Sequence, residues 1–517
     1  MGSVSVVVVG AGIAGLASAD RLLTSISESR PDLTINVTVL EGSDRAGGRI
    51  RTHVFGDEIV ELGATWLHGT VNNPLYDLLK HFRSTTVTGT SLSLPAGLSI
   101  CPRVSRNALI KQKWIGFQTK GHSIAPFLVD EANALYNRLL DECNQMALNP
   151  FPPSCLDVGS YMKMGLEEYM RSKHSPKQLE CKHLVESVFN YRMTGETVMS
   201  GCDSMDEVSL HWFGDYRELR GGDRRVDEGM NVLVDGLVAR LPKNCIFFNS
   251  IVDKICWSKD TTSKKKPVTV YTRNGKSYEA DHVIFTGSLG VLKHRGLDNS
   301  FSGLFDPSLP EEKQSAINRL GMDAVEKVFV RFERRFWPEQ CRGYNFCWPI
   351  QDKSSKFYND TDFSWMKKVV GLCSRYSNSP VMSGWITGKE AVKMTSESSH
   401  ALNQKFDDLM EYFVHQSEIP EVVEVLHTDW CRNELFQGAY SYPAVGCSPK
   451  DFDTLAQPLP APPSSTNNDV KTPQLQLLFA GEATHRNYYS TLHGAYLTGI
   501  READRIFSLY EHSTDES

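Results

Sequence analysis

Three glycines near the start of the chain have the spacing of a site for a dinucleotide phosphate. Gly10, Gly12 and Gly15 stand between a run of valines and the amphipathic segment "LASADRLL", that is, between an expected strand and an expected helix. Such glycines allow a tight turn and a close backbone approach to a pyrophosphate, which the amino end of the helix attracts. A second expected strand, "INVTVLE", ends in Glu41, where a carboxylate can accept hydrogen bonds from an adenosine ribose. The pattern predicts a nucleotide cofactor.

A lysine interrupts an apolar strand near the middle of the chain. In "GMDAVEKVFVRFE" the β-branched and aromatic residues predict a strand packed on both faces, with Lys327 pointing inward beside Val325 and Phe329. Burying an ammonium is costly unless something inside the protein needs it. The strand pattern alone leaves open whether this lysine is functional or only extends its charged end to the surface.

Three segments that look like a strand, a turn and a helix are far apart in the sequence. Besides the first, "HVIFTGSLGVLK" lies near residue 285, and "LQLLFAGEATHRNYYSTLHGAYLTGIREADRI" comes near the end. They predict an α/β protein in which a discontinuous Rossmann-like domain is interrupted by an α+β domain. We expect the cofactor domain to comprise residues 1–85, 225–300 and 475–517, and the second domain residues 86–224 and 301–474. The Pro- and Ser-rich residues 455–474 are predicted to form a flexible insertion.

The composition is that of an ordinary globular protein, and its mild acidic balance is compatible with a cationic small substrate. The 517 residues are 40% hydrophobic and 23% charged, and the net charge of −7 argues against nucleic acid as the main partner. The opening "MGSVSVVVVG" has neither a basic region nor a long apolar run, so we expect no signal peptide and no membrane partner.

The cysteines and the chain pattern suggest a location and an oligomeric state. Twelve cysteines show neither Cys-x-x-Cys pairs nor zinc-ligand spacing, so we expect no metal site and mostly reduced thiols. Without a secretory signal the cytoplasm is the expected location. No coiled-coil pattern is evident, which favours a monomer.

Several motifs resemble those of one enzyme family. "LEGSDRAGGR", "LGATWLHG" and "LLFAGEATHRNYYSTLHGAYLTGIREADRI", in this order, resemble the flavin-containing amine oxidases, which include monoamine oxidases, polyamine oxidases and lysine-specific histone demethylases. The resemblance runs nearly end to end. It is strongest to plant polyamine oxidases and animal spermine oxidases, through "SMDEVSL" and "YYSTLHGAY". The Gly-Gly-Arg turn after Glu41 also suits FAD better than NAD, because Arg49 can meet the diphosphate.

The resemblance implies FAD and the residues that surround it. It assigns to the diphosphate Gly10, Gly12, Ala14, Gly15 and Arg49, and to the ribose Glu41. The other implied cofactor-binding residues are Gly63, Ala64, Thr65, Trp66, Val252, Glu482, Thr491 and Leu492. Monoamine oxidases attach their flavin through a cysteine, but the matching stretch "QGAYSYPAVG" has Ala439 at that position. The FAD is therefore expected to be non-covalent.

The resemblance also implies a reaction. Hydride transfer to flavin N5 from the carbon beside a secondary amine of spermine or thermospermine would give an imine, which hydrolyses to an aldehyde and an amine. Oxygen is the expected acceptor and hydrogen peroxide the by-product. By its match to the family, Lys327 is the catalytic residue that holds a water at N5. Tyr440 matches one aromatic wall beside the flavin, whereas Thr491 stands where many relatives have the other.

Because one of the two aromatic walls is missing here, the substrate must be held elsewhere along its length. The resemblance implicates His68 and Glu207, and more weakly Ser209, in binding the polyamine. A carboxylate suits a distal ammonium, and a histidine can hydrogen-bond an inner amine. The structural alternatives are a turn residue for His68 and a helix-capping carboxylate for Glu207. Trp430 is equally compatible with core packing and with the site.

Other functions remain as alternatives at this point. A monoamine oxidase is disfavoured by Thr491, and an amino-acid oxidase needs an arginine for the substrate carboxylate, which the motifs do not identify. A histone demethylase usually carries added chromatin-binding modules. A flavoprotein sensor without catalysis is disfavoured by the presence of both Lys327 and Tyr440. The sequence does not select the side of the inner nitrogen that is cleaved, nor one polyamine among free and acetylated forms.

Overall fold

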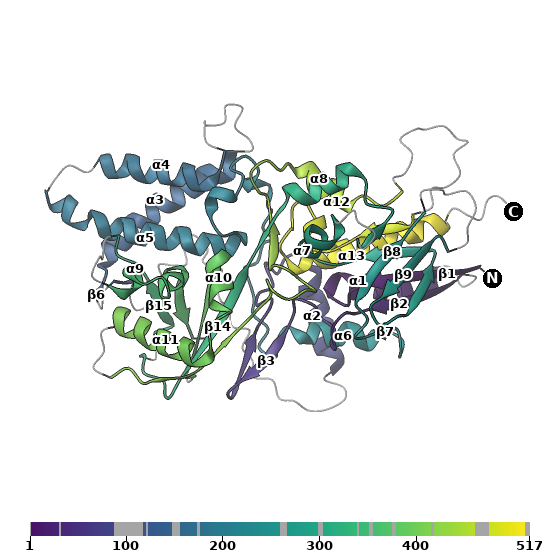
Figure 1. Ribbon diagram of the computed structural model, residues 1–517, viewed down its shortest axis with the longest axis horizontal. Coiled ribbons are helices and arrows are strands. Elements are labelled where there is room, and N and C mark those ends of the chain that lie inside the picture. The colour runs from purple at the N-terminus through teal and green to yellow at the C-terminus, as the bar shows by residue number, and fades with distance from the viewer. Residues whose placement is uncertain are drawn as a thin grey trace.

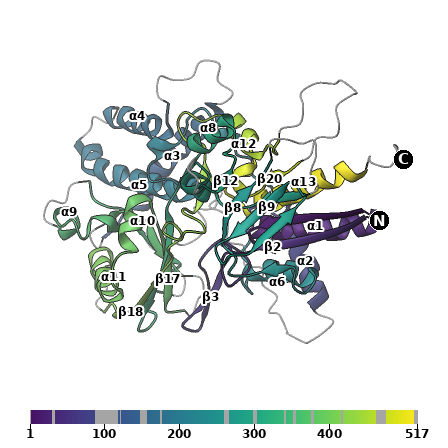
Figure 2. The same cartoon turned by 45° about the vertical axis from the view of Figure 1, so that its right-hand side comes forward.

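The computed structural model describes residues 2–29, 33–86, 117–119, 122–146, 156–172, 176–258, 266–297, 303–338, 341–350, 355–374, 379–414, 418–460 and 475–511. They form two lobes that lie side by side (Figure 1). One lobe contains β1 (Gly2–Val9) and α13 (Leu492–Glu511), and the other contains α5 (Pro176–Ser200) and α11 (Ser399–Phe413). The same separation is visible after a 45° turn (Figure 2).

A five-stranded parallel sheet forms the centre of the first lobe. Its order is β20-β11-β1-β2-β7, with β2 at Leu33–Leu40, β7 at Ile246–Phe247, β11 at His282–Phe285 and β20 at Leu477–Phe479. Three distant segments of the chain therefore contribute to one sheet. This arrangement confirms the predicted α/β, Rossmann-like class, while the exact domain boundaries stay a prediction.

Alternate residues of β1 pack into two different cores, as the two-residue period of a strand requires. Val6 and Val8 join the core beneath a helical layer, which comprises α1 (Ile13–Ser29), α2 (Pro74–Thr86), α6 (Asn231–Arg240) and α13. Val7 and Val9 face a second, four-stranded sheet of order β10-β9-β8-β12. Its strands are β8 (Val252–Cys256), β9 (Val268–Thr272), β10 (Ser277–Ala280) and β12 (Phe305–Asp306). Short helices complete this layer: α7 (Leu289–Val291), α8 (Glu311–Arg319) and α12 (Pro449–Ala456).

The second lobe combines a seven-stranded sheet with two groups of helices. The strand order is β18-β14-β17-β16-β15-β5-β6. The strands are β18 (Val422–His427), β14 (Val325–Phe332), β17 (Val381–Thr387), β16 (Gly371–Cys373), β15 (Gly343–Phe346), β5 (Phe117–Thr119) and β6 (His122–Ser123). One helical group is α9 (Lys356–Asn359), α10 (Gly388–Met394) and α11, and the other is α3 (Pro126–Gln145), α4 (Val158–Arg171) and α5. Figure 1 shows α3, α4 and α5 together in the upper part of this lobe, above α10 and α11.

Two small strand pairs complete the fold. The antiparallel pairs are β3 (Thr52–Phe55) with β4 (Glu58–Glu61), and β13 (Gly321–Asp323) with β19 (Tyr440–Tyr442). Both pairs end beside residues assigned to the site from the sequence. They connect the lobe that should hold the cofactor with the lobe that should hold the substrate.

Strand β14 is buried on both faces, as its sequence predicts. Val328 and Val330 pack into the core of the second lobe, and Phe329 on the opposite face joins a cluster with Leu62 and Trp430. Lys327 lies on the same face as Phe329 and is partly accessible. Of the predicted insertion at 455–474, residues 461–474 lie outside the described residues.

Candidate active site

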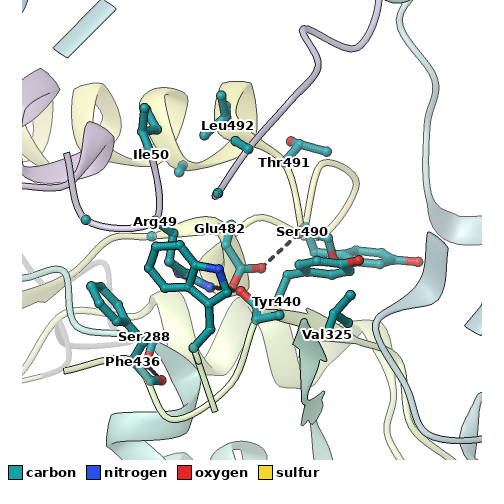
Figure 3. A pocket seen from close by; sticks show the side chains of 18 of the residues that line it. Arg49, Ile50, Ser288, Val325, Phe436, Tyr440, Glu482, Ser490, Thr491 and Leu492 are labelled. Carbon is teal, nitrogen blue, oxygen red and sulfur yellow. Dashed lines mark hydrogen bonds and ion pairs between the residues drawn. The ribbon is translucent and has the colours of Figure 1, made fainter. Parts of the chain in front are cut away.

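A cavity of about 1450 Å³ is lined by residues of both lobes. Its lining includes the turn after β1, residues 40–42, 47–50 and 250–252, part of α5, and residues 218–223 and 225. Lys327, Tyr440 and Thr491 line the same cavity. Figure 3 shows how side chains from β14, β19 and the start of α13 approach one another there.

The glycine turn has the shape that a bound diphosphate requires. Gly10 has a φ of +100°, and a Cβ on Gly15 would lie 2.0 Å from the carbonyl oxygen of Gly10. A Cβ on Gly12 would meet no protein atom within 4 Å, and Gly12 and Ala14 both line the cavity. The open space at Gly12, in front of the amino end of α1, fits the diphosphate of FAD.

Alanine substitutions in this turn should separate cofactor binding from folding. Gly12→Ala should leave the apoprotein as stable as wild type but reduce its flavin content, because only the cofactor would contact the new methyl group. Gly15→Ala should also destabilise the apoprotein, by about 1–3 kcal/mol, because its Cβ overlaps the Gly10 carbonyl. Thermal unfolding of both apoproteins and the flavin-to-protein absorbance ratio check this. Full flavin binding by Gly12→Ala would contradict the assignment.

Glu41 is buried and oriented by the backbone around it. One carboxylate oxygen accepts from the Ala11 amide at 2.7 Å, and the other accepts from the amide and the hydroxyl of Ser43, each at 2.8 Å. A carboxylate has about four acceptor positions, so capacity remains for a ribose hydroxyl. Val252 also lines the cavity, and its carbonyl accepts from Arg295 Nη1 at 3.2 Å.

Arg49 and Glu482 form an ion pair beside β19 and the start of α13. Arg49 Nη1 lies 3.0 Å from Glu482 Oε1 and 2.6 Å from the carbonyl oxygen of Ala439. Glu482 Oε2 accepts from the Ser441 hydroxyl at 2.6 Å and from the Ser490 amide at 2.8 Å, the bond drawn in Figure 3. Among the described residues Arg49 bonds only through Nη1, so Nε and Nη2 can meet a diphosphate.

The start of α13 lies against the cavity and is capped by Thr491. The Thr491 hydroxyl accepts from the Gly494 amide at 3.0 Å and donates to the Tyr488 carbonyl at 2.7 Å. Ser490, directly before it, has a φ of +64°. Thr491 and Leu492 both line the cavity, so the positive end of the helix dipole faces it, and a role beside the flavin stays a prediction.

Lys327 is held by the segment that runs from Glu61 to Thr65. Its Nζ donates to the carbonyl oxygens of Glu61, at 2.8 Å, and Gly63, and to the Thr65 hydroxyl at 2.5 Å. Burial lowers the pKa of Lys327 to about 7, against the opposing effect of the Glu61 carboxylate. Arg225 lowers this pKa further, and its guanidinium stacks on the Trp66 ring, 4.2 Å from the centroid.

The aromatic wall is anchored to α5. The Tyr440 hydroxyl donates to the carbonyl of Val198, and burial raises the pKa of this phenol. A Cβ on Gly201 would lie 2.6 Å from the Tyr440 ring, so the ring packs directly on the turn after α5. The Trp430 indole donates to the Leu62 carbonyl at 3.1 Å and also lines the cavity. Trp430 therefore serves both core packing and the site.

The residues implicated in polyamine binding lie in two different environments. His68 lines the cavity, and its Nδ1 is 3.1 Å from a carboxylate oxygen of Asp223. Glu207 and Ser209 are not among the residues that line the cavity. The Glu207 carboxylate accepts from the Tyr442 hydroxyl at 2.9 Å, and the Ser209 amide donates to the Pro443 carbonyl. Their role in substrate binding stays a prediction.

The structure adds acidic residues that the sequence did not identify. The carboxylates of Glu196, Glu218 and Asp223 belong to residues that line the cavity. Glu196 lies on α5, and Tyr136 donates to it at 2.9 Å. Arg192, Gly195, Glu196 and Met199 all line the cavity. Their spacing of three, four and seven residues marks one helix face and could have indicated this wall.

The described residues include no helix long and apolar enough to span a membrane. Ten cysteines are described, and all are free thiols.

Comparisons with known proteins agree with this geometry. Residues 13–507 match the family described as flavin containing amine oxidoreductase. The chain is 34% identical to the peroxisomal N(1)-acetyl-spermine/spermidine oxidase of Bos taurus, over 98% of this chain and 95% of the relative. It is 32% identical to the Homo sapiens protein of the same name, over 98% and 96%. It is 30% identical to probable polyamine oxidase 5 of Arabidopsis thaliana, over 98% of both chains. The predicted family, fold and flavin cofactor are confirmed: the chain belongs to the flavin-containing amine oxidoreductases.

Proposed function

We propose that this protein is an FAD-dependent polyamine oxidase that acts on the carbon beside a secondary amine of spermine, thermospermine or a close relative. The observation that carries the proposal is the set of groups that line one cavity. The nucleotide cradle, a lysine with a lowered pKa, the Tyr440 wall and acidic residues that include Glu196, Glu218 and Asp223 all line it. Relatives named for spermine, spermidine and polyamine oxidation support the same substrate class.

Bound FAD supplies a hydride acceptor, and oxygen is the expected final acceptor, forming hydrogen peroxide. The substrate loses a hydride from carbon and a proton from nitrogen, and the imine hydrolyses to an aldehyde and an amine. The amine must reach the reacting position neutral, because a protonated nitrogen has no lone pair to assist loss of the hydride. Lys327, with a pKa of about 7, can exchange a proton near neutral pH. Its Nζ is held in the cavity by the Glu61 and Gly63 carbonyls and the Thr65 hydroxyl.

The remaining residues position a polycation. Tyr440 and the small Thr491 side chain form a shallow wall rather than a cage, so selectivity must come from charges along the cavity. Asp223 fixes the His68 ring through Nδ1, which leaves Nε2 for an inner amine. Both carboxylates accept from a tyrosine hydroxyl, Glu196 from Tyr136 and Glu207 from Tyr442, but of these two glutamates only Glu196 lines the cavity. We therefore add Glu196 to Glu207 as a candidate partner for the distal ammonium.

Anaerobic absorbance titration of the purified flavoprotein tests the proposal. Spermine and thermospermine should bleach the flavin band quickly, and a simple monoamine or an L-amino acid should not. Equal bleaching by the monoamine would contradict the roles of His68 and the carboxylates. Bound flavin that none of these compounds reduces would favour a sensor.

Matched variants in the same assay distinguish the two carboxylates. Glu196→Gln should raise the half-saturating spermine concentration about tenfold, the cost of one charge-assisted contact, if Glu196 holds the distal ammonium. Glu207→Gln is then the control. The opposite result would assign the ammonium to Glu207.

We further propose a non-covalent FAD and a cytoplasmic monomer. Ala439 cannot form a thioether, and ten free cysteines suit a reducing compartment. Release of FAD on acid denaturation, sedimentation of the holoenzyme, and cell fractionation against a peroxisomal marker test the three statements.

A further inference from the structure

The three hydrogen-bond partners of Lys327 are not equivalent. An ammonium has three donors, and the Glu61 carbonyl, the Gly63 carbonyl and the Thr65 hydroxyl accept one each. The two carbonyls can only accept. The hydroxyl can accept from the ammonium and can also donate to a neutral amine.

The segment that carries these partners is fixed by its surroundings. Trp430 donates to the Leu62 carbonyl at 3.1 Å, and the Ala64 amide donates to the Arg49 carbonyl at 3.1 Å. A Cβ on Gly63 would lie only 1.8 Å from that same Arg49 oxygen, so the two backbones are in close contact. The carbonyls therefore cannot reorient when Lys327 changes its protonation state. Rotation of the Thr65 hydroxyl is the one adjustment that needs no backbone movement.

We propose that Thr65 is a positioning residue for Lys327, whose hydroxyl accepts a hydrogen bond from the ammonium and turns to donate one to the neutral amine. In the neutral form the two remaining N–H groups stay on the Glu61 and Gly63 carbonyls, and the nitrogen lone pair faces Thr65. The Lys327 nitrogen thus keeps the same position in its charged and neutral states. The inference deepens the proposed function, since it concerns the lysine on which that function rests.

The charged groups around Lys327 set the direction of the expected effect. The Glu61 carboxylate favours the ammonium, Arg225 disfavours it, and the Cys373 thiol, when ionised, also favours it. Hydrogen bonds from a charged group are roughly twice as strong as neutral ones. Loss of the Thr65 hydroxyl therefore costs the ammonium more than the neutral amine, and the pKa of Lys327 should fall.

Competitive labelling of the holoenzyme tests this without a substrate. The rate at which acetic anhydride modifies Lys327, followed by peptide mass spectrometry across pH, reports its titration directly. Thr65→Val keeps the shape without the hydroxyl and should move the midpoint from about pH 7 to lower pH by about one unit, the size of one charge-assisted bond. Thr65→Ser should restore the wild-type midpoint, and Thr65→Ala provides a second deletion should Thr65→Val not fold.

The outcomes separate this inference from the proposed function. A midpoint that is unchanged in Thr65→Val or Thr65→Ala would overturn it, and so would Thr65→Ser behaving like Thr65→Val. A shifted midpoint with serine rescue would support it even if no polyamine reduced the flavin. In that case the proposed polyamine oxidation would be refuted, but the hydrogen bond between Thr65 and Lys327 would be supported. If polyamines do reduce the flavin, the pH profile of that step should shift with the labelling midpoint.

Discussion

Replacing Lys327 with methionine should slow anaerobic flavin reduction by spermine by about 10²–10⁴-fold, the range for a positioned proton-transfer group. Methionine keeps the unbranched apolar stem, one atom shorter than lysine, but removes the charge and all three donors to Glu61, Gly63 and Thr65. Stopped-flow reduction under anaerobic conditions isolates this step from oxygen chemistry. The variant should also lose any rate change centred near pH 7, because that is where the wild-type amine titrates.

Lys313 offers a matched control for the substitution. It is only 2% exposed, and its amine donates to the carbonyls of Thr454, Leu455 and Gln457 at the end of α12. Burial lowers the pKa of Lys313 to about 7 as well, yet it does not line the cavity. Lys313→Met should therefore weaken the fold and leave the reduction rate per bound flavin unchanged. Equal loss of rate in both variants would mean that Lys327 acts through stability alone.

The lowered pKa values of Lys327 and Lys313 also predict the direction in which the free energy of unfolding changes with pH. Because burial lowers their pKa values from 10.5 to about 7, the unfolded chain binds more protons than the folded protein between these pH values. Their contribution to the free energy of unfolding therefore rises as the pH increases from about 7 to 10.5. Each methionine variant should lose its share of that rise, which denaturant unfolding at several pH values would measure.

Features set by short-range patterns could be predicted from the sequence. The glycine turn, β14 with its inward lysine, and the start of α13 near Thr491 follow from spacing within one element. Thr491 carried a further signal, because a threonine directly before a helix is a common cap. Its hydroxyl donates to Tyr488 and accepts the capping bond from Gly494, and a role of Thr491 towards the substrate stays a prediction.

Features set by contacts between distant elements could not be predicted. Glu196 reaches the cavity because α5 packs against Tyr440 through Gly201; the spacing around Glu196 marks a helix face but does not say what that face meets. The Glu207 carboxylate turns to Tyr442, a partner supplied by a strand far along the chain. The motifs and charges indicated which residue types a polyamine site needs. Tertiary packing determines which residues of those types line the cavity.

Replacing Arg49 with methionine should weaken FAD binding by about a hundredfold or more, the equivalent of two charge-assisted hydrogen bonds to the diphosphate. It should also destabilise the apoprotein, because the Glu482 carboxylate, only 7% exposed, would lose its charged partner. FAD titration of the apoprotein and its thermal unfolding measure the two effects separately. Glu482→Gln should destabilise less, since an amide can still bond Ser441 and Ser490 through one of its atoms.

The double variant Arg49→Met, Glu482→Gln decides what Arg49 does. Removing both charges leaves no unpaired carboxylate, so the apoprotein should regain much of the stability that Arg49→Met loses. FAD binding should stay weak, because the Nε and Nη2 donors available to the diphosphate are still missing. If the double variant instead recovered full FAD affinity, Arg49 would act only by pairing with Glu482 and so holding β19 and α13 in place. Direct contact with the diphosphate would then have to come from the glycine turn and the amino end of α1 alone.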